Sequence, residues 1–280
     1  MDTFDIGGDL TVRRLGFGAM RITGEDIIGE PEDAEAARDV LHRAADLVDL
    51  IDTADSYGPG VSERLIGQTL APYDDDVVVA TKGGLLRNSS GDWLPRCDPD
   101  HLRNAVLCSR DRLRTDTIDL YQLHTVDPDV DLEDSVTALA ELKDDGLLEH
   151  VGLSNVSLEQ LETARDHVDV ATVQNHFNVE TRDTARVDGD GRRVLEACEA
   201  DDIGFIPYFP LAAGDVSGAA GIRAVADAHD ATPEQVALAW LLERSDVILP
   251  IPGTSSVRHL EDNVAAADIE LTPAEFERLT

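Results

Sequence analysis

The chain has 280 residues, 42% of them hydrophobic, and its 57 acidic against 23 basic residues give a formal net charge of −34. This charge makes nucleic acid and anionic membranes poor partners. No apolar run approaches the 18 residues that a membrane span needs, so the composition predicts a chain with one large buried core.

Eight short apolar runs recur along the chain, and each is typical of a buried strand. In chain order they are Leu15–Phe17, Leu50–Thr53, Val77–Thr81, Thr117–Leu123, Leu148–Leu153, Val170–Gln174, Gly204–Tyr208 and Val247–Pro250. Before the first run, Gly7-Gly8-Asp9 separates two short apolar segments, which predicts a β-hairpin. No Pro- or Ser-rich linker interrupts residues 1–280, so we expect a single domain.

Helical patterns occupy the intervals between these runs. Leu132, Val136, Leu139 and Leu142 are spaced to fall on one helix face, and capping boxes begin at Ser157, Thr232 and Thr272. Strand and helix alternating eight times predict a parallel (β/α)8 TIM barrel, with the N-terminal β-hairpin plugging its bottom. The competing doubly wound sheet needs a third glycine after Gly16-Phe17-Gly18, and that glycine is absent.

Polar residues stand where the predicted strands end. Asp52 and Tyr57 follow the second strand, Lys82 ends the third, and His124 ends the fourth. The carboxyl ends of barrel strands carry the active residues in folds of this type. Lys82 is one of only two lysines in a chain with 21 arginines, although it closes an apolar run where a cation is costly to bury.

These four side chains together favour one kind of chemistry. An ammonium at Lys82 about 4 Å from Tyr57 would lower the pKa of the phenol toward the range of a general acid. Asp52 would keep Lys82 charged, and His124 would orient a carbonyl oxygen. The group therefore suits an oxygen that gains negative charge, as a carbonyl does when it accepts hydride. Asp55, in the same loop as Tyr57, is instead a candidate helix cap.

The motif set resembles that of the aldo-keto reductase superfamily, and less specifically its bacterial pyridoxal reductase-like branch. The resemblance runs from about Gly16 to Asn263 and lies in the following motifs: Asp52-Thr53-Ala54 with Tyr57-Gly58, Ala80-Thr81-Lys82, Leu120-Tyr121-Gln122-Leu123-His124, Val151-Gly152-Leu153-Ser154-Asn155 and Ile251-Pro252-Gly253-Thr254-Ser255-Ser256. It implies reduction of an aldehyde or ketone by hydride from a nicotinamide cofactor, with no metal, and with Tyr57 as the proton donor.

The resemblance also implies a role for each matching residue. Asp52, Tyr57, Lys82 and His124 would be the catalytic tetrad. Cofactor contacts would come from Gly18, Ala19, Met20, Asp52, Ser154, Asn155, Gln174, Tyr208, Pro210, Leu211, Gly253, Thr254, Ser255, His259, Asp262 and Asn263. Of these, Ser154, Asn155 and Gln174 would hold the carboxamide, and Tyr208 would stack on the nicotinamide ring. Met20 and Trp93 are candidates to line the substrate pocket.

Two departures from the family pattern bear on the cofactor and the substrate. Gly253 and His259 stand where many members carry basic residues, so NADP(H) is favoured less strongly and NAD(H) stays open. The chain stops at Thr280, without the long C-terminal loop of some members, so we expect an open substrate site.

Two other functions compete with this interpretation. One is a non-catalytic, cofactor-binding regulator of the same fold, against which an intact tetrad argues. The other is an unrelated barrel lyase or isomerase that would use Lys82 to form a Schiff base.

The remaining expectations concern where and in what state the chain works. Three scattered cysteines, Cys97, Cys108 and Cys198, and a start without signal-peptide features favour a cytoplasmic protein, and a monomer is the favoured state. The acid excess and lysine scarcity suggest adaptation to a cytoplasm of high salt, since molar salt shortens the Debye length to about 3 Å.

Overall fold

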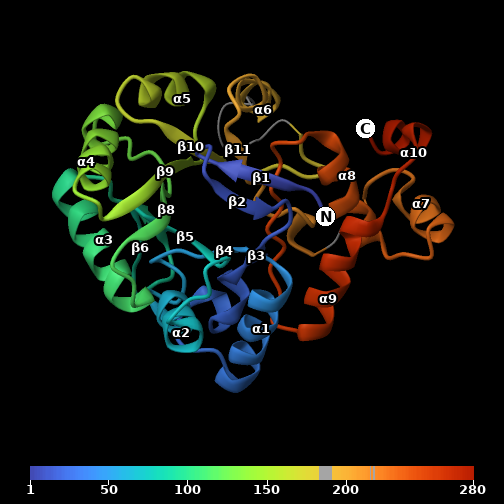
Figure 1. Cartoon of the computed structure of the whole chain (residues 1–280), viewed down its shortest axis with the longest axis horizontal. Coiled ribbons are helices and arrows are strands. Elements are labelled where there is room, and N and C mark those ends of the chain that lie inside the picture. The colour runs from blue at the N-terminus through green and yellow to red at the C-terminus, as the bar shows by residue number, and fades with distance from the viewer. Residues whose placement is uncertain (183–190, 215, 217) are drawn as a thin grey trace.

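In the computed structural model, which describes residues 1–182, 191–214, 216 and 218–280, seven parallel strands form one curled sheet ringed by helices (Figure 1). The strand order is β3–β4–β5–β8–β9–β10–β11, so chain neighbours are also sheet neighbours. The strands span Phe17–Gly18 (β3), Leu50–Asp52 (β4), Val78–Gly83 (β5), Ile118–Leu123 (β8), Leu148–Ser154 (β9), Val170–Gln174 (β10) and Gly204–Phe205 (β11). This is the α/β barrel class of architecture that the alternating pattern predicts.

Ten α-helices of the described residues surround the sheet. They are Ala34–Leu47 (α1), Val61–Leu70 (α2), Pro99–Leu113 (α3), Leu132–Asp144 (α4), Leu158–Arg165 (α5), Gly191–Ala200 (α6), Ile222–Ala228 (α7), Pro233–Arg244 (α8), Val257–Ala265 (α9) and Pro273–Leu279 (α10). The capping boxes predicted at Ser157, Thr232 and Thr272 are confirmed at the starts of α5, α8 and α10. None of the described helices is long and apolar enough to cross a membrane.

The eighth predicted strand, Val247–Pro250, does not form a regular strand. Its backbone still bonds to both sides: Leu249 N donates to Phe205 O over 2.8 Å, and Gly16 N donates to Pro250 O over 2.9 Å. Gly18 N also donates to Pro252 O over 3.3 Å. Prolines at 250 and 252 have no N–H to donate, so this segment bonds to β3 only through its carbonyls and forms no continuous ladder.

The N-terminal residues form an antiparallel pair, Thr3–Ile6 (β1) with Leu10–Arg13 (β2), turned through Gly7-Gly8-Asp9. Figure 1 shows this pair lying across the centre of the ring. Ile6 and Val12 are fully buried against Leu50, Val78 and other residues at the starts of the sheet strands. The opposite, carboxyl ends of the strands are therefore the accessible end.

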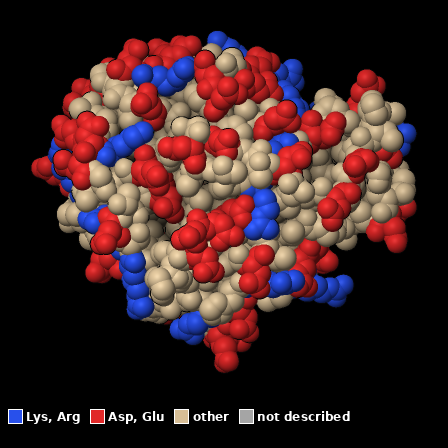
Figure 2. All heavy atoms as spheres, in the orientation of Figure 1, with Lys and Arg blue, Asp and Glu red and all other residues tan. Residues whose placement is uncertain are grey.

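Two more strands follow Lys82, in a region that the sequence does not mark as β-structure. Leu85–Arg87 (β6) pairs antiparallel with Trp93–Pro95 (β7) and places Arg87 directly opposite Trp93. Acidic side chains spread over the face shown in Figure 2 with smaller basic groups between them.

Candidate active site

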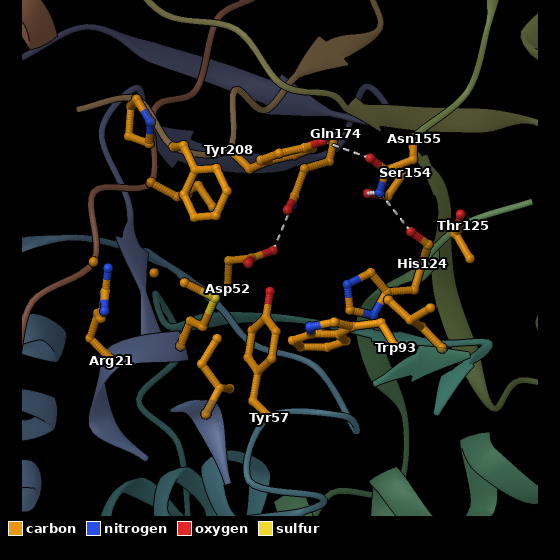
Figure 3. Close-up of a pocket in the computed structure, with 18 of the residues that line it drawn as sticks. Arg21, Asp52, Tyr57, Trp93, His124, Thr125, Ser154, Asn155, Gln174 and Tyr208 are labelled. Atoms are coloured by element: carbon orange, nitrogen blue, oxygen red, sulfur yellow. Dashed lines mark hydrogen bonds between the residues drawn. The ribbon is translucent and has the colours of Figure 1, made fainter. Parts of the chain in front are cut away.

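A cavity of about 840 Å³ opens at the carboxyl ends of the sheet strands. The sequence predicts the active residues at these strand ends, and Figure 3 shows the residues that line the cavity. Its lining includes the following predicted residues: Gly18, Met20, Asp52, Tyr57, Trp93, His124, Ser154, Asn155, Gln174, Tyr208, Pro210, Leu211 and Gly253. Strands distant in sequence thus bring these residues to one site.

Lys82 and Asp52 form a buried ion pair at the base of this cavity. Lys82 Nζ lies 2.6 Å from Asp52 Oδ2 and donates a second hydrogen bond of 2.8 Å to Thr53 O. Burial alone lowers the pKa of the Lys82 ammonium, but Asp52 and Tyr57 more than offset it, so the pKa ends above its usual value. Lys82 is therefore a charged side chain fixed in place, unlike a free amine.

Two amide side chains complete the surroundings of Asp52, and the sequence argument missed one of them. Gln174 Nε2 donates to Asp52 Oδ1 over 2.8 Å, and Gln122 Nε2 donates to the same oxygen over 3.2 Å. Gly152 makes room for Gln122, since a Cβ there would lie 2.9 Å from Gln122 Cγ. Side chains alternate along a strand, so the inward-facing His124 signals that Gln122, two residues earlier, also faces inward.

Tyr57 stands beside this pair, with Lys82 Nζ 5.2 Å from the centre of its ring. Burial raises the pKa of the Tyr57 phenol; Lys82 opposes this shift, while Asp52 adds to it. The expectation that Lys82 lowers this pKa overall is therefore wrong, because removing the phenolate from water outweighs the attraction of the ammonium. Tyr57 keeps its proton at neutral pH, as a donor must.

His124 lies edge-on to Tyr57, with ring centres 5.9 Å apart, and its Nδ1 lies 3.3 Å from Ser56 Oγ. Burial, followed by the charge of Lys82, lowers the pKa of His124 well below its usual value. The imidazole is therefore neutral and has one N–H. It suits the role of a hydrogen-bond donor to an oxygen better than that of a cation.

Polar side chains that could hold a carboxamide line one wall together. Asn155, in a left-handed backbone conformation (φ 58°), donates through Nδ2 to His124 O and Ser154 Oγ. Tyr208 donates a 2.7 Å hydrogen bond to Asn155 Oδ1, and its ring stacks on His176. Gln174 lines the same cavity and donates through Nε2 to Asp52, so its Oε1 is the acceptor of this side chain.

The Gly253 end of the cavity carries a cation that the sequence analysis did not identify, Arg21. Gly18 and Gly253 approach so closely that a Cβ on Gly253 would lie 2.8 Å from Gly18 O. Arg21 lies beside them, with its Cγ 3.6 Å from that same Cβ position. Among the described lining residues, Arg21 is the only Lys or Arg. Arg21 directly follows Gly18-Ala19-Met20 in the sequence, and this position beside predicted cofactor residues could have identified it.

Several predicted cofactor residues lie outside the cavity wall. Ala19, for example, is fully buried. Beyond Gly253, Thr254 Oγ1 accepts from Ser256 N, and Ser256 caps α9 by accepting from His259 N. Four predicted residues remain. Ser255 precedes the start of α9, and His259, Asp262 and the buried Asn263 lie along this helix.

A second buried polar cluster lies behind Tyr57. Glu63 is fully buried and accepts hydrogen bonds of 2.6 Å from Thr81 Oγ1 and from Arg112 Nε. Near it, Asp55 Oδ1 is buried without a hydrogen-bond partner among the described residues. Asp55 caps no helix, contrary to expectation, because α2 starts after Gly60. Burial, then the charge of Glu63, raises the pKa of Asp55 to about 8.

The sequence model described as "Aldo/keto reductase family" matches residues 14–280. An uncharacterized oxidoreductase of Schizosaccharomyces pombe is 46% identical over 274 residues, covering 97% of this chain and 87% of that protein. Pyridoxine 4-dehydrogenase of Escherichia coli is 40% identical over 279 residues, covering 97% and 94%. An aldo-keto reductase of Klebsiella pneumoniae in complex with NADPH superposes with a TM-score of 0.79 at 26% identity, covering 99% and 93%. The chain therefore belongs to the aldo/keto reductase family, as its motifs predict.

Proposed function

We propose that this protein reduces an aldehyde or ketone to the alcohol, using NADP(H), with Tyr57 as the general acid. The observation that carries the proposal is the buried Lys82–Asp52 pair, 2.6 Å apart, set beside a protonated Tyr57 and a neutral His124 on one cavity wall. The proposal includes a complete eight-stranded barrel in a single domain, with the 247–252 segment as its eighth member.

The cavity fits a nicotinamide cofactor on its own features. Its volume exceeds what a small carbonyl compound needs, and it extends from Trp93 to Gly253. At one end, Ser154, Asn155 and Gln174 offer donors and acceptors to a carboxamide. At the other end the guanidinium of Arg21 suits a phosphate, and no described residue pairs with it.

The chain's own residues then divide the work. A nicotinamide cofactor held here would supply the hydride that the carbonyl carbon accepts. Tyr57 donates its proton to the carbonyl oxygen, and the neutral His124 donates a hydrogen bond that orients this oxygen. Lys82 stabilises the tyrosinate that remains, and Asp52, held by two amides, keeps Lys82 aimed. The reverse reaction oxidises an alcohol.

A preference for NADP(H) over NAD(H) rests on Arg21. Many family members carry a basic residue at the position of Gly253. In this chain Gly253 has no side chain, and the side chain of Arg21 lies beside it. Because His259 replaces a second basic residue, we expect the preference to be modest.

The setting of the enzyme is part of the proposal. We propose a cytoplasmic monomer from a high-salt cytoplasm, on the strength of the charge of −34 and the scattered cysteines. A non-catalytic regulator is disfavoured because it would not need an intact tetrad. A Schiff-base enzyme is disfavoured because Asp52 keeps Lys82 charged.

NADPH and NADH oxidation by the purified protein, measured with aldehydes and ketones including pyridoxal in molar KCl, tests the proposal. We expect turnover with a higher kcat/KM for NADPH. Binding of NADPH without reduction of any carbonyl compound would favour the regulator, and an NADH preference would refute the role given to Arg21.

A further inference from the structure

Arg87 connects two segments that line the Trp93 end of the cavity. Its Nη1 donates to Ile27 O over 3.2 Å and its Nη2 to Asp26 O over 3.0 Å. Its Nε and Nη2 also donate to Gly91 O, in the turn between β6 and β7. The guanidinium fork of this one side chain thus holds the 26–27 segment and the β6–β7 hairpin together.

Arg87 also fixes the orientation of Trp93. The guanidinium carbon lies 3.9 Å from the centre of the indole ring, as expected for two residues directly opposite in an antiparallel pair. The indole in turn meets His124 edge-on, with ring centres 6.4 Å apart. Trp93 lines the cavity close to His124 and Tyr57, as Figure 3 shows.

The segment that Arg87 holds is strained. Asp26 and Ile27 are consecutive non-glycine residues with φ of 55° and 62°, and a positive φ is especially unfavourable for the β-branched Ile27. The Ile27 carbonyl accepts from Arg87 and also from Gly58 N, next to Tyr57. These hydrogen bonds keep Ile27 in the cavity wall and tie that wall to the loop that carries the proton donor.

The wall so formed is largely apolar. Beside the indole of Trp93 it comprises Ile27, Leu85 and Val126, and the polar groups near it are His124 and Thr125. The only Lys or Arg among the described lining residues, Arg21, lies at the Gly253 end, on the far side of Asp52 and Tyr57 from Trp93 (Figure 3). An anionic substrate would therefore meet a chain of net charge −34 at an end of the cavity that no described Lys or Arg lines.

We propose that Arg87 is a specificity-determining residue that holds Trp93 and Ile27 as the two sides of a slot for a flat, uncharged aromatic aldehyde or ketone. The inference rests on the reductase function proposed above, and it names the substrate class of that site. An aromatic ring would pack against the indole and the aliphatic side chains, while its carbonyl group reaches Tyr57 and His124.

Three aldehydes separate the contributions of ring and charge: benzaldehyde, 4-carboxybenzaldehyde and propanal, each reduced with NADPH in molar KCl. We expect the wild-type kcat/KM to be about tenfold higher for benzaldehyde than for either of the others. Arg87→Ala should lower kcat/KM for benzaldehyde about tenfold, mainly through KM, and leave propanal reduction and the KM for NADPH nearly unchanged. Arg87→Lys should not restore it, because an ammonium lacks the planar fork.

Arg96→Ala is the matched control, since Arg96 is an exposed arginine of the same hairpin that does not line the cavity. Trp93→Leu is a second variant that removes the indole and leaves Arg87 bonded to the 26–27 segment. It should lose the preference for benzaldehyde over propanal. If Arg87→Ala affects the two aldehydes equally, or the wild type does not prefer benzaldehyde, the inference is wrong and the reductase function stands.

A binding measurement separates failure of the inference from failure of the proposed function. Trp240, the other tryptophan, is fully buried, so benzyl alcohol added without cofactor should quench mainly the fluorescence of Trp93. We expect this quenching in the wild type and its loss in Arg87→Ala. Quenching without turnover of any aldehyde would refute the reductase and retain the aromatic slot; turnover without quenching would refute the slot.

Discussion

Gln122 Nε2 donates a 3.2 Å hydrogen bond to Asp52 Oδ1, on the carboxylate oxygen that Lys82 does not contact. Both side chains are buried, and Gln122 is not part of the cavity wall. It therefore acts on the reaction through Asp52 and through Gln174, whose Nε2 donates a 3.4 Å hydrogen bond to Gln122 Oε1.

We expect Gln122→Leu to reduce kcat about tenfold and to leave the Kd of NADPH unchanged. A hydrogen bond to a charged group contributes about 1.5–3 kcal/mol, and each 1.4 kcal/mol is a tenfold change. The pH profile of kcat should also shift, because Asp52 raises the pKa of Lys82 and Gln122 holds Asp52 in place. Gln68→Leu, at an exposed glutamine on α2, is the control. A variant with wild-type kcat and pH profile would show that Gln122 only fills space.

Tyr57→Phe should reduce carbonyl reduction by a factor of about 10²–10⁴, the usual contribution of a general acid. The change removes one hydroxyl, so the circular dichroism spectrum and NADPH affinity should be retained. Single-turnover reduction of benzaldehyde measures the loss. Near-wild-type kcat in this variant would mean that another group donates the proton.

Arg21→Ala should weaken NADPH binding about tenfold or more, since a charge-assisted hydrogen bond to phosphate is lost. NADH binding should change less if Arg21 contacts the 2′-phosphate, and equally if it contacts the pyrophosphate. Fluorescence titration of both cofactors measures the difference, with the exposed Arg223→Ala as control. Unchanged affinity for both cofactors would remove Arg21 from the site.

Asp55 should make the protein less stable as pH rises from about 4 to 8. Its pKa is raised from 3.8 to about 8 by burial, so the folded state binds a proton that the unfolded state has lost across this window. The stabilisation is complete below pH 4 and is lost by up to about 1.4 kcal/mol per pH unit until the folded-state carboxyl ionises near pH 8. Asp55→Asn stays neutral throughout.

Urea unfolding of wild type and Asp55→Asn at pH 5, 7 and 9 tests this, with the difference between the two proteins isolating Asp55 from other carboxyls. The variant should gain on the wild type between pH 5 and 7 and hold a nearly constant difference above pH 8. A difference that does not depend on pH would show that Asp55 is ionised in the folded protein.

Salt should stabilise the fold. At about 0.01 M salt the Debye length is about 30 Å, so many of the 57 acids repel one another, while at molar salt it falls to about 3 Å. A domain has only about 5–15 kcal/mol of net stability, so modest repulsion over many pairs matters. Thermal melts from about 0.1 to about 3 M KCl should show a rising Tm. A flat or falling Tm would end the halophilic interpretation and leave the catalytic one intact.

The sequence predicts the architecture well because continuous apolar runs mark strands that are buried on both faces, and helical spacing marks the helix face that meets the core. Strand ends gave the places of Asp52, Lys82 and His124, whose side chains meet in the structure. The eighth predicted strand, Val247–Pro250, is not a regular strand in the structure. Its apolar residues indicate burial, but Pro250 and Pro252 lack the N–H groups that a continuous ladder needs.

Other features depend on tertiary geometry that no local pattern carries. The raised pKa of Tyr57 follows from burial, which spacing along the chain does not reveal. Arg87 shows no signal either, because its hydrogen-bond partners at 26–27 lie some 60 residues earlier in the sequence. Arg21 and Gln122 were within reach, since each adjoins a motif already recognised.

The hydrogen bonds from Gly16 to Pro250 and from Gly18 to Pro252 join the first strand of the ring to a segment near the end of the chain. During synthesis, β3 therefore waits for almost the entire polypeptide before its outer side gains a partner, and contacts of such long separation form slowly. Until then β3 and β11 are both open edges, where strands of other chains could pair. Gly18 and Gly253 flank this junction, so the proposed phosphate end of the cavity is assembled last. The net charge of −34 destabilises the folded chain by repulsion between its acids, but the same repulsion between chains opposes pairing of these open edges before folding is complete.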